Sequence, residues 1–283
     1  MFEKLAFFFY KILYFTNLII AKLFNRNFLL WFKEFIENDH YIDFYINNKN
    51  IKLFTPNNLV KWRNDTFFDK EPETIEWIKN FKLKKFYFWD IGSNIGQYSL
   101  YCALIHPGSS IISFEPSANN LRVLSRNIGC NKLEKQITIF PIALTNKVNN
   151  FLNLLESSSQ EGSAHNSFGR HNNINQHFIS YKTYGTSIDY IIEKKILPIP
   201  NYIKIDVDGI EESILQGGIK YLSNKELLEV SIEINENEVK KFNKIKNIFF
   251  KSKFKIKHKK HNHKFLNVTG SENTFNYIFK KTN

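Results

Sequence analysis

Cysteine and arginine are scarce in this chain of 283 residues. The two cysteines, Cys102 and Cys130, are too few for a disulfide framework or a C-x-x-C metal site, and they favour a reducing, cytoplasmic compartment. Arginine accounts for five of the 39 basic residues, so the net charge of +12 comes almost entirely from lysine. Bidentate contacts to phosphates and bases favour arginine, and we therefore expect no nucleic-acid partner.

Long uncharged stretches are also missing. The longest in the N-terminal region, Ile12 to Ala21, is too short to span a bilayer, although residues 1–36 are strongly apolar. Lys4, Lys11 and Lys22 are 7 and 11 residues apart and so fall along one line of a helix. We expect this helix to pack on the catalytic domain or on a partner subunit. Peripheral membrane contact through residues 1–25, at the inner face, is the alternative.

The chain does contain enough apolar residues, 43%, for a large core. Residues 41–62 alternate around Asn47 to Asn50 and indicate a hairpin, and residues 73–81 indicate a short helix. Strand and helix patterns then alternate, which favours an α/β fold with a parallel sheet covered on both faces. The expected strands are 86–89, 110–114, 137–140, 201–206, 228–234, 253–257 and 274–280, and the expected helices are 96–106, 117–128, 187–195, 210–222 and 236–250. The polar stretch 145–185 interrupts this rhythm as an insertion, either a lid or a disordered loop.

The most informative motif is a strand, Phe86 to Trp89, followed by Asp90 and the turn Gly92-Ser-Asn-Ile-Gly96. Glycine lets a ligand approach the backbone, and the following helix presents free N–H groups. The spacing fits neither the G-x-G-x-x-G fingerprint nor the P-loop, and an acid before the glycines would repel a pyrophosphate. Glu115, at the end of the next strand, occupies the usual place of a carboxylate that binds ribose hydroxyls. Together these features indicate a site for S-adenosylmethionine.

A second motif, Tyr202 to Glu211, ends a buried-type strand with one cation and three carboxylates near its tip. Ligands of open α/β sheets bind at the carboxyl ends of strands, and crowded carboxylates shift one another's pKa values. We select Asp206 as the general base or acceptor anchor, with Lys204, Asp208 and Glu211 as alternates. Part of this set is equally explained as turn and helix-start residues.

With both motifs in hand, the chain resembles the FkbM family of S-adenosylmethionine-dependent methyltransferases over about residues 86–235. The resemblance implies a Rossmann-like class I methyltransferase fold with a mostly parallel seven-stranded sheet and helices on both faces. It divides the chain into an N-terminal helical and hairpin extension, 1–80, and a methyltransferase domain, 81–283. The matching segments are Asp90 to Gly96, Phe114 to Pro116, Leu121 to Asn127, Thr186 to Asp189, Lys204 to Glu211 and Leu215 to Gly217.

The family implies O-methylation of a hydroxyl on a sugar, glycan or related secondary metabolite, so the partner is a small-molecule or glycan acceptor. Asp90, Gly92, Asn94 and Gly96 are assigned to the methionine end of the cofactor, Glu115 to its ribose and Ala143, beside Ile142, to its adenine. His165 is a second base candidate. We assign no metal, because nothing shows that Asp206, Asp208 and Glu233 converge, and His258, His261 and His263 lie in a lysine-rich run. The alternatives are an RNA methyltransferase and a non-catalytic scaffold at a membrane.

Overall fold

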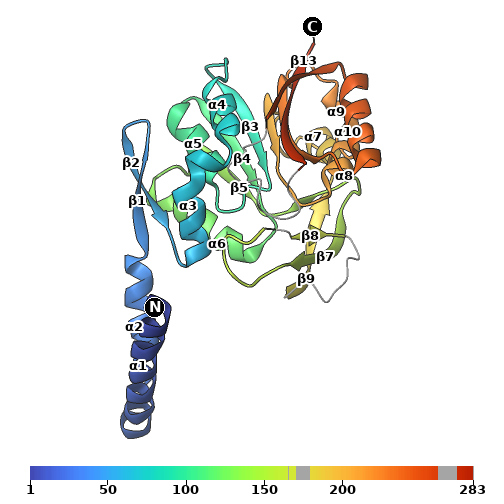
Figure 1. Cartoon of the computed structure of the whole chain (residues 1–283). Coiled ribbons are helices and arrows are strands. Elements are labelled where there is room, and N and C mark those ends of the chain that lie inside the picture. The colour runs from blue at the N-terminus through green and yellow to red at the C-terminus, as the bar shows by residue number, and fades with distance from the viewer. Residues whose placement is uncertain (165, 170–178, 261–272, 283) are drawn as a thin grey trace.

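A seven-stranded sheet forms the centre of the molecule in the computed structural model, which describes residues 1–164, 166–169, 179–260 and 273–282. Its strands are β3 (Phe86–Ile91), β4 (Ser109–Phe114), β5 (Ile137–Phe140), β10 (Tyr202–Ile205), β11 (Glu229–Asn235), β12 (Phe254–Lys260) and β13 (Thr274–Lys281). They lie in the order β12-β13-β11-β10-β3-β4-β5 (Figure 1). The five strands from β11 to β5 are parallel, and β13 is antiparallel to both neighbours. The predicted α/β class and mostly parallel seven-stranded sheet are thus confirmed.

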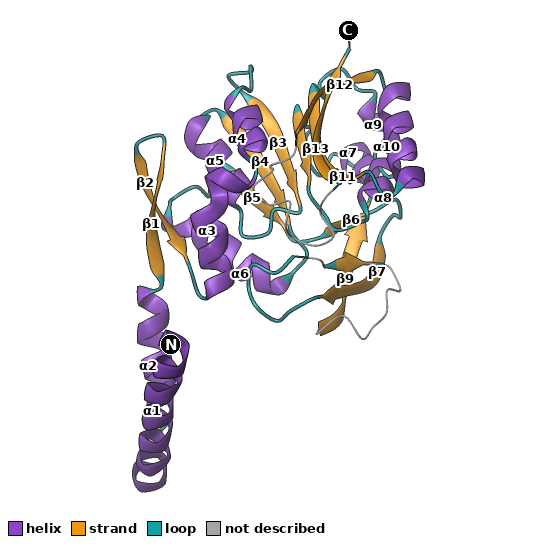
Figure 2. Cartoon of the chain, viewed as in Figure 1, coloured by secondary structure: helices purple, strands orange, loops and turns teal. Residues whose placement is uncertain are grey.

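Helices cover both faces of this sheet (Figure 2). On one face lie α4 (Pro72–Lys79), α5 (Gln97–Ile105) and α6 (Ala118–Cys130), and on the other α7 (Ile188–Glu193), α8 (Glu211–Gln216), α9 (Ile219–Leu222) and α10 (Val239–Lys251). Phe88 and Trp89 are both 0% exposed, yet they enter opposite cores because strand side chains alternate between faces. This two-sided burial explains why β3 reads as a continuous apolar run.

The helix expected over 210–222 is divided at Gly217 and Gly218 into α8 and α9. A Cβ atom at Gly217 would lie 2.2 Å from the carbonyl oxygen of Thr145. The end of α8 is therefore pressed against the backbone of a neighbouring loop, and this close approach requires glycine.

The insertion is largely folded in the part of it that the structure describes. Strands β6 (Ala143–Leu144), β7 (Asn150–Glu156), β8 (Ser167–Phe168) and β9 (Ile179–Thr186) form a second sheet in the order β6-β9-β7-β8. Figure 1 shows this sheet below the carboxyl ends of the central strands. The expectation of a lid or a disordered loop did not include these strands, because the Ser and Asn residues of this stretch outweighed the apolar residues of β7, which are Phe151, Leu152, Leu154 and Leu155.

The N-terminal region begins with two helices, α1 (Phe2–Phe24) and α2 (Phe28–Asp39), which form a hairpin that projects away from the rest of the molecule (Figure 1). Asn17 is the one buried residue of α1, so this helix does not pack on the catalytic domain as expected. By length and composition α1 is long and apolar enough to cross a membrane, which the short uncharged run did not indicate.

The antiparallel hairpin of β1 (Tyr41–Ile46) and β2 (Lys49–Phe54) is followed by α3 (Asn58–Lys70), a helix that the sequence analysis missed. Asn57 caps α3 by accepting a hydrogen bond from the Val60 N–H at 2.9 Å. Phe67 of α3 and Leu53 of β2 are buried in the same core as Phe88. This part of the N-terminal extension therefore shares a core with the central sheet, and the domain boundary near residue 80 stays a prediction.

Candidate active site

One large pocket, of about 970 Å³, opens at the carboxyl ends of β3, β4, β10 and β11. Its walls come from both sheets, from α3 and from the start of α8. Among the residues predicted for the site, those on its wall are Gly92, Asn94, Glu115, Ile142, Ala143, Asp206, Asp208 and Glu211. The two sequence motifs, which lie more than a hundred residues apart, thus face a common cavity.

The glycine turn is tightly held between two strands. Gly92 adopts a φ of 82°, and a Cβ atom there would lie 2.0 Å from the carbonyl oxygen of Asp206. The N–H groups of Gly92 and Ser93 both donate to the carbonyl oxygen of Phe114 at 3.0 Å. Since an L side chain rarely adopts this φ, glycine is required where β3 approaches β10 so closely. This contact fixes the turn relative to Asp206.

The carboxylate of Glu115 is buried and holds the turn. Its Oε2 accepts a hydrogen bond from the Asn94 N–H at 2.8 Å, and its Oε1 accepts one from the Ser117 N–H at 2.9 Å. Burial raises the pKa of Glu115 to about 7, although these N–H donors oppose the shift. The acid predicted to bind ribose thus also supports the backbone of the turn.

Unpaired polar atoms lie beside this carboxylate. The Asn94 amide donates to the carbonyl oxygen of Ser163 at 2.8 Å, but Asn94 Oδ1 and Ser163 Oγ are buried without a hydrogen-bond partner among the described residues. Buried polar groups are rarely left unpaired, so these two atoms fit a polar ligand in the pocket. Together with the glycine turn, these two atoms suit the binding of a nucleoside-like cofactor.

Asp90 and Gly96 lie behind the wall. Asp90 is 0% exposed and accepts a hydrogen bond from Ser99 Oγ at 2.6 Å. Burial raises its pKa, against the attraction of Lys204. A Cβ atom at Gly96 would meet Leu124 of α6 at 2.3 Å. Direct contact of these two residues with a ligand stays a prediction, and the structure shows them supporting the turn from beneath.

The tip of β10 carries an ion pair between a buried lysine, Lys204, and a partly exposed aspartate, Asp206. Lys204 Nζ lies 2.5 Å from Asp206 Oδ2, 3.9 Å from Glu71 Oε2 and 4.4 Å from the centroid of the Tyr98 ring. Burial disfavours the charge of Lys204, but Asp206, Glu71 and Asp90 outweigh burial and raise its pKa. Lys204 is 3% exposed and lies behind Asp206, so it acts on the pocket through that carboxylate.

The other two carboxylates of this motif differ in position. Asp208 is exposed at the rim of the pocket. Glu211 is buried, accepts a hydrogen bond from the Gly209 N–H at 2.8 Å and is ion-paired with Lys241. Burial raises the pKa of Glu211, and Lys241 opposes that shift. Of the four predicted catalytic residues, Asp206 is thus the one that is both on the pocket wall and beside the glycine turn.

Glu233 of β11 was considered only as a metal ligand, yet it lines the same pocket. Burial, followed by the negative charges of Asp206 and Glu71, raises its pKa to about 8. Asp206 has the opposite shift, because Lys204, Lys70 and Arg63 outweigh burial and lower its pKa. Neighbouring carboxyl groups with pKa values driven apart are typical of acid–base sites.

Sequence reasoning also missed three charged residues on α3 and at its end. Arg63, Lys70 and Glu71 line a small side pocket of about 40 Å³ together with Gly92, Asn94 and Asp206. Arg63 Nε donates to the carbonyl oxygen of Gly162 at 2.5 Å. No motif marked these residues, because α3 lies outside the resemblance, the hairpin predicted over 41–62 covered only its start, and residues 63–72 were assigned to no element.

His165, His261 and His263 lie outside the described residues. Within the described ranges, no group of three or more His, Cys, Asp and Glu side chains is arranged to hold a metal ion.

Comparison with known proteins gives a family match. The model of the methyltransferase FkbM domain matches residues 90–267 of this chain, more than half of its length. The hexuronic acid methyltransferase AglP of Haloferax volcanii is 27% identical over 159 residues. That alignment covers 54% of this chain and 59% of the relative, so it spans less than two thirds of AglP.

Solved structures give weaker similarities. A methyltransferase FkbM from Methylobacillus flagellatus has a TM-score of 0.47 at 15% identity, covering 70% of this chain and 45% of that chain. A putative SAM-dependent methyltransferase from Streptococcus mutans has a TM-score of 0.49 at 11% identity, covering 85% and 55% respectively. Similarities at these TM-scores support no conclusion about function. The fold is assigned from the order and direction of the strands in the central sheet.

Proposed function

Because the chain belongs to the FkbM family of S-adenosylmethionine-dependent methyltransferases, we propose that it transfers the methyl group of this cofactor to a hydroxyl of a sugar or glycan. The observation that carries the proposal is the placement of Asp206 and Glu233, two carboxyl groups with opposite pKa shifts, on the pocket that the glycine turn borders. The matched relative AglP is named a hexuronic acid methyltransferase, which supports a sugar acceptor.

The residues present can hold the cofactor. Glu115 offers a carboxylate to ribose hydroxyls, Ala143 and Ile142 offer apolar surface to adenine, and Asn94 offers its unpaired amide oxygen. Arg63 and Lys70, on the side pocket, provide positive charge for the carboxylate of the methionine end. When bound, the cofactor supplies an electrophilic methyl group on a sulfonium. The binding site therefore includes residues from the N-terminal extension as well as the two motifs.

Glu233 suits proton removal from the acceptor hydroxyl better than Asp206 does. A general base is most effective when its pKa is near the working pH, and the pKa of Glu233 is about 8. Asp206 is held ionised by Lys204, so it is a weak base and a strong hydrogen-bond acceptor. We assign Asp206 to anchoring the acceptor hydroxyl and Glu233 to accepting its proton. Positive charge from a bound sulfonium would favour the ionised form of Glu233.

The remainder of the wall is rich in uncharged polar groups, which suits an acceptor with many hydroxyls. The amide and hydroxyl side chains on it, besides Asn94, are Asn120, Ser157, Ser158, Gln160, Ser163, Asn166, Asn235, Thr274 and Asn276. Amide and hydroxyl groups both donate and accept hydrogen bonds, as a sugar does. Free thiols at Cys102 and Cys130 support a cytoplasmic location for this reaction.

The test uses the full chain with methyl-labelled cofactor and three acceptor sets: uronic-acid glycans, neutral glycans and RNA. We expect label on a glycan hydroxyl, and a cofactor affinity measurable by calorimetry. Glu233→Gln should lower the transfer rate by about 10²- to 10⁴-fold with little change in cofactor affinity. Glu226→Gln, at an exposed carboxylate away from the pocket, is the matched control.

Three outcomes would contradict the proposal. Label on RNA would replace the glycan acceptor by a nucleic acid. No cofactor binding would favour a non-catalytic scaffold. Full activity of Glu233→Gln together with an inactive Asp206→Asn would return the role of base to Asp206.

A further inference from the structure

We propose that the α1–α2 hairpin is a docking surface for an anionic phospholipid bilayer, with α1 lying in the plane of the interface. The proposal does not depend on the methyl acceptor. Both helices of the hairpin are exposed along almost their whole length: Asn17 is the one buried residue of the 23 in α1, and α2 has none. Patches of exposed apolar surface on this scale mark interaction sites.

The apolar residues of α1 include one continuous row. Its members follow one another at intervals of three or four residues, so they lie along one side of the helix. Each has between 47% and 68% of its surface exposed: Leu5, Phe8, Ile12, Phe15, Ile19 and Leu23. This row, the α1 stripe, has the length of the whole helix.

A line of lysines borders the α1 stripe. Lys4, Lys11 and Lys22 each immediately precede a stripe residue, so each cation lies beside apolar surface. The Lys11 ammonium lies 5.1 Å from the centroid of the Phe7 ring and 5.8 Å from that of Tyr14. Cations along the full helix beside an apolar face are typical of a helix in the interface plane. A spanning orientation would place Lys11, near the middle of α1, in hydrocarbon.

Charge favours a bilayer over a second copy of this chain. Helix α1 carries three lysines and one acidic residue, Glu3, in a chain of net charge +12. The acidic residues of α2 lie toward its end, at Glu34, Glu37 and Asp39, and Glu37 is ion-paired with the body. Two copies of α1 would therefore repel each other, whereas anionic headgroups complement its lysines. Exposed apolar residues also continue onto α2 at Leu30, Trp31 and Phe35, which extends the surface beyond a single helix.

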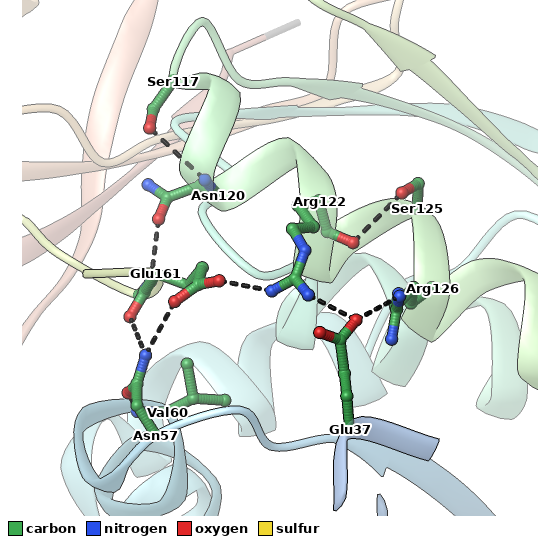
Figure 3. A network of polar contacts seen from close by, with 10 residues as sticks. Glu37, Asn57, Val60, Ser117, Asn120, Arg122, Ser125, Arg126 and Glu161 are labelled. Atoms are coloured by element: carbon green, nitrogen blue, oxygen red, sulfur yellow. Dashed lines mark hydrogen bonds and ion pairs between the residues drawn. The ribbon is translucent and has the colours of Figure 1, made fainter. Parts of the chain in front are cut away.

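Polar contacts tie the hairpin to the catalytic body. Within the hairpin, Asn17 Oδ1 accepts a hydrogen bond from the Leu29 N–H at 3.2 Å. At the end of α2, Glu37 Oε1 lies 2.5 Å from the guanidinium groups of both Arg122 and Arg126 on α6 (Figure 3). A lipid-bound hairpin would therefore hold α6 in a defined position above the membrane.

The same contacts reach the wall of the pocket. Arg122 is also ion-paired with Glu161, whose carbonyl oxygen and carboxylate accept hydrogen bonds from the Asn57 amide at 3.2 and 3.1 Å (Figure 3). The next residue, Gly162, donates its N–H to Asn120 Oδ1 at 2.9 Å. Glu161 and Gly162 belong to the loop that supplies Gln160 and Ser163 to the pocket. Membrane docking would thus set the direction in which the pocket faces the bilayer.

The test is co-sedimentation of the full chain with vesicles of phosphatidylcholine alone and of phosphatidylcholine mixed with phosphatidylglycerol. We expect binding to the anionic vesicles that weakens with salt. Lys4→Gln, Lys11→Gln and Lys22→Gln together should weaken it by about fivefold for each lysine removed. Lys194→Gln, Lys195→Gln and Lys225→Gln remove the same charge elsewhere and should leave binding unchanged.

A second triple variant tests the apolar part. Phe8→Ser, Phe15→Ser and Ile19→Ser should abolish sedimentation with vesicles and leave cofactor binding by calorimetry intact, which shows that the body is folded. Four results would overturn the proposal: no binding of the wild-type chain to either vesicle, equal loss in the control lysine variant, resistance to alkaline carbonate extraction, or a stable dimer in lipid-free buffer that the serine variant abolishes. None of these results bears on methyl transfer.

Discussion

Gly92→Ala should destabilise the protein and its cofactor site together. The substitution adds a Cβ atom 2.0 Å from the Asp206 carbonyl oxygen and 3.0 Å from Val207 Cγ1, at a φ of +82°. A left-handed conformation costs a non-glycine residue about 1–3 kcal/mol. Relieving the overlap requires a backbone shift between β3 and β10, for which overpacking costs of about 1–3 kcal/mol are a guide. The free energy of unfolding should therefore fall by about 2–6 kcal/mol.

Gly129→Ala is the matched control with the opposite sign. Gly129 lies in α6, and a Cβ atom there would meet nothing within 4 Å. Alanine in a helix is favoured over glycine by about 0.5–1 kcal/mol, so this variant should be slightly more stable than the wild type. The same chemical change thus yields opposite effects according to φ and to the space around the residue.

Urea unfolding followed by circular dichroism measures both variants, and calorimetry measures their affinity for the cofactor. Gly92→Ala should lose both stability and affinity, whereas Gly129→Ala should keep the affinity. A loss of less than about 1 kcal/mol for Gly92→Ala, or shifts of the same sign in both variants, would refute the reasoning about the close approach of β3 and β10.

Three further expectations concern charged groups. Lys204→Met removes the cation that neutralises Asp206 and Glu71, so the free energy of unfolding should fall by about 3 kcal/mol and the pKa of Asp206 should rise, as urea unfolding and NMR titration would show. Glu233→Gln should gain stability relative to the wild type as the pH rises from about 4.5 to 8. Because the pKa of Glu233 is higher in the folded state, its protonated carboxyl stabilises the wild type below the unfolded-state pKa, and this stabilisation is lost as the pH rises through the folded-state pKa. A stability difference between the two proteins that does not change with pH would contradict this prediction. Glu37→Gln weakens partly exposed ion pairs and should change global stability by less than about 1 kcal/mol, yet limited proteolysis should release the hairpin faster; equal rates would contradict the tie to α6.

The central sheet could be predicted from the sequence because the local apolar patterns of its strands agree with how those strands pack. The apolar run that ends at Asp90 is buried on both faces in β3, and the acids Glu115 and Asp206 follow strands that end at the pocket. A motif at a strand end can be placed from sequence, since parallel strands bring their carboxyl ends to one edge.

The features of the site that the sequence did not predict depend on contacts between residues far apart in the chain. Arg63 and Glu71 reach the site because Phe67 of the same region packs in the core of the sheet, and no local pattern indicates that docking. Asp90 is likewise buried behind the turn and accepts a hydrogen bond from Ser99, a contact that a spacing rule does not reveal. The raised pKa of Glu233 arises from burial and then from the negative charges of Asp206 and Glu71, which are more than twenty residues away in the chain.

The position of β13 determines when, during synthesis of the chain, the pocket wall can be completed. The last strand lies between β11 and β12, and its residues Thr274 and Asn276 complete the pocket wall. Asn276 also donates a hydrogen bond to Glu73 Oε1 at 2.8 Å, which joins β13 to α4. During synthesis, β11 therefore stays unpaired on one side until residues 274–281 have left the ribosome. The pocket wall can be completed only after this non-local pairing, which is slow to form.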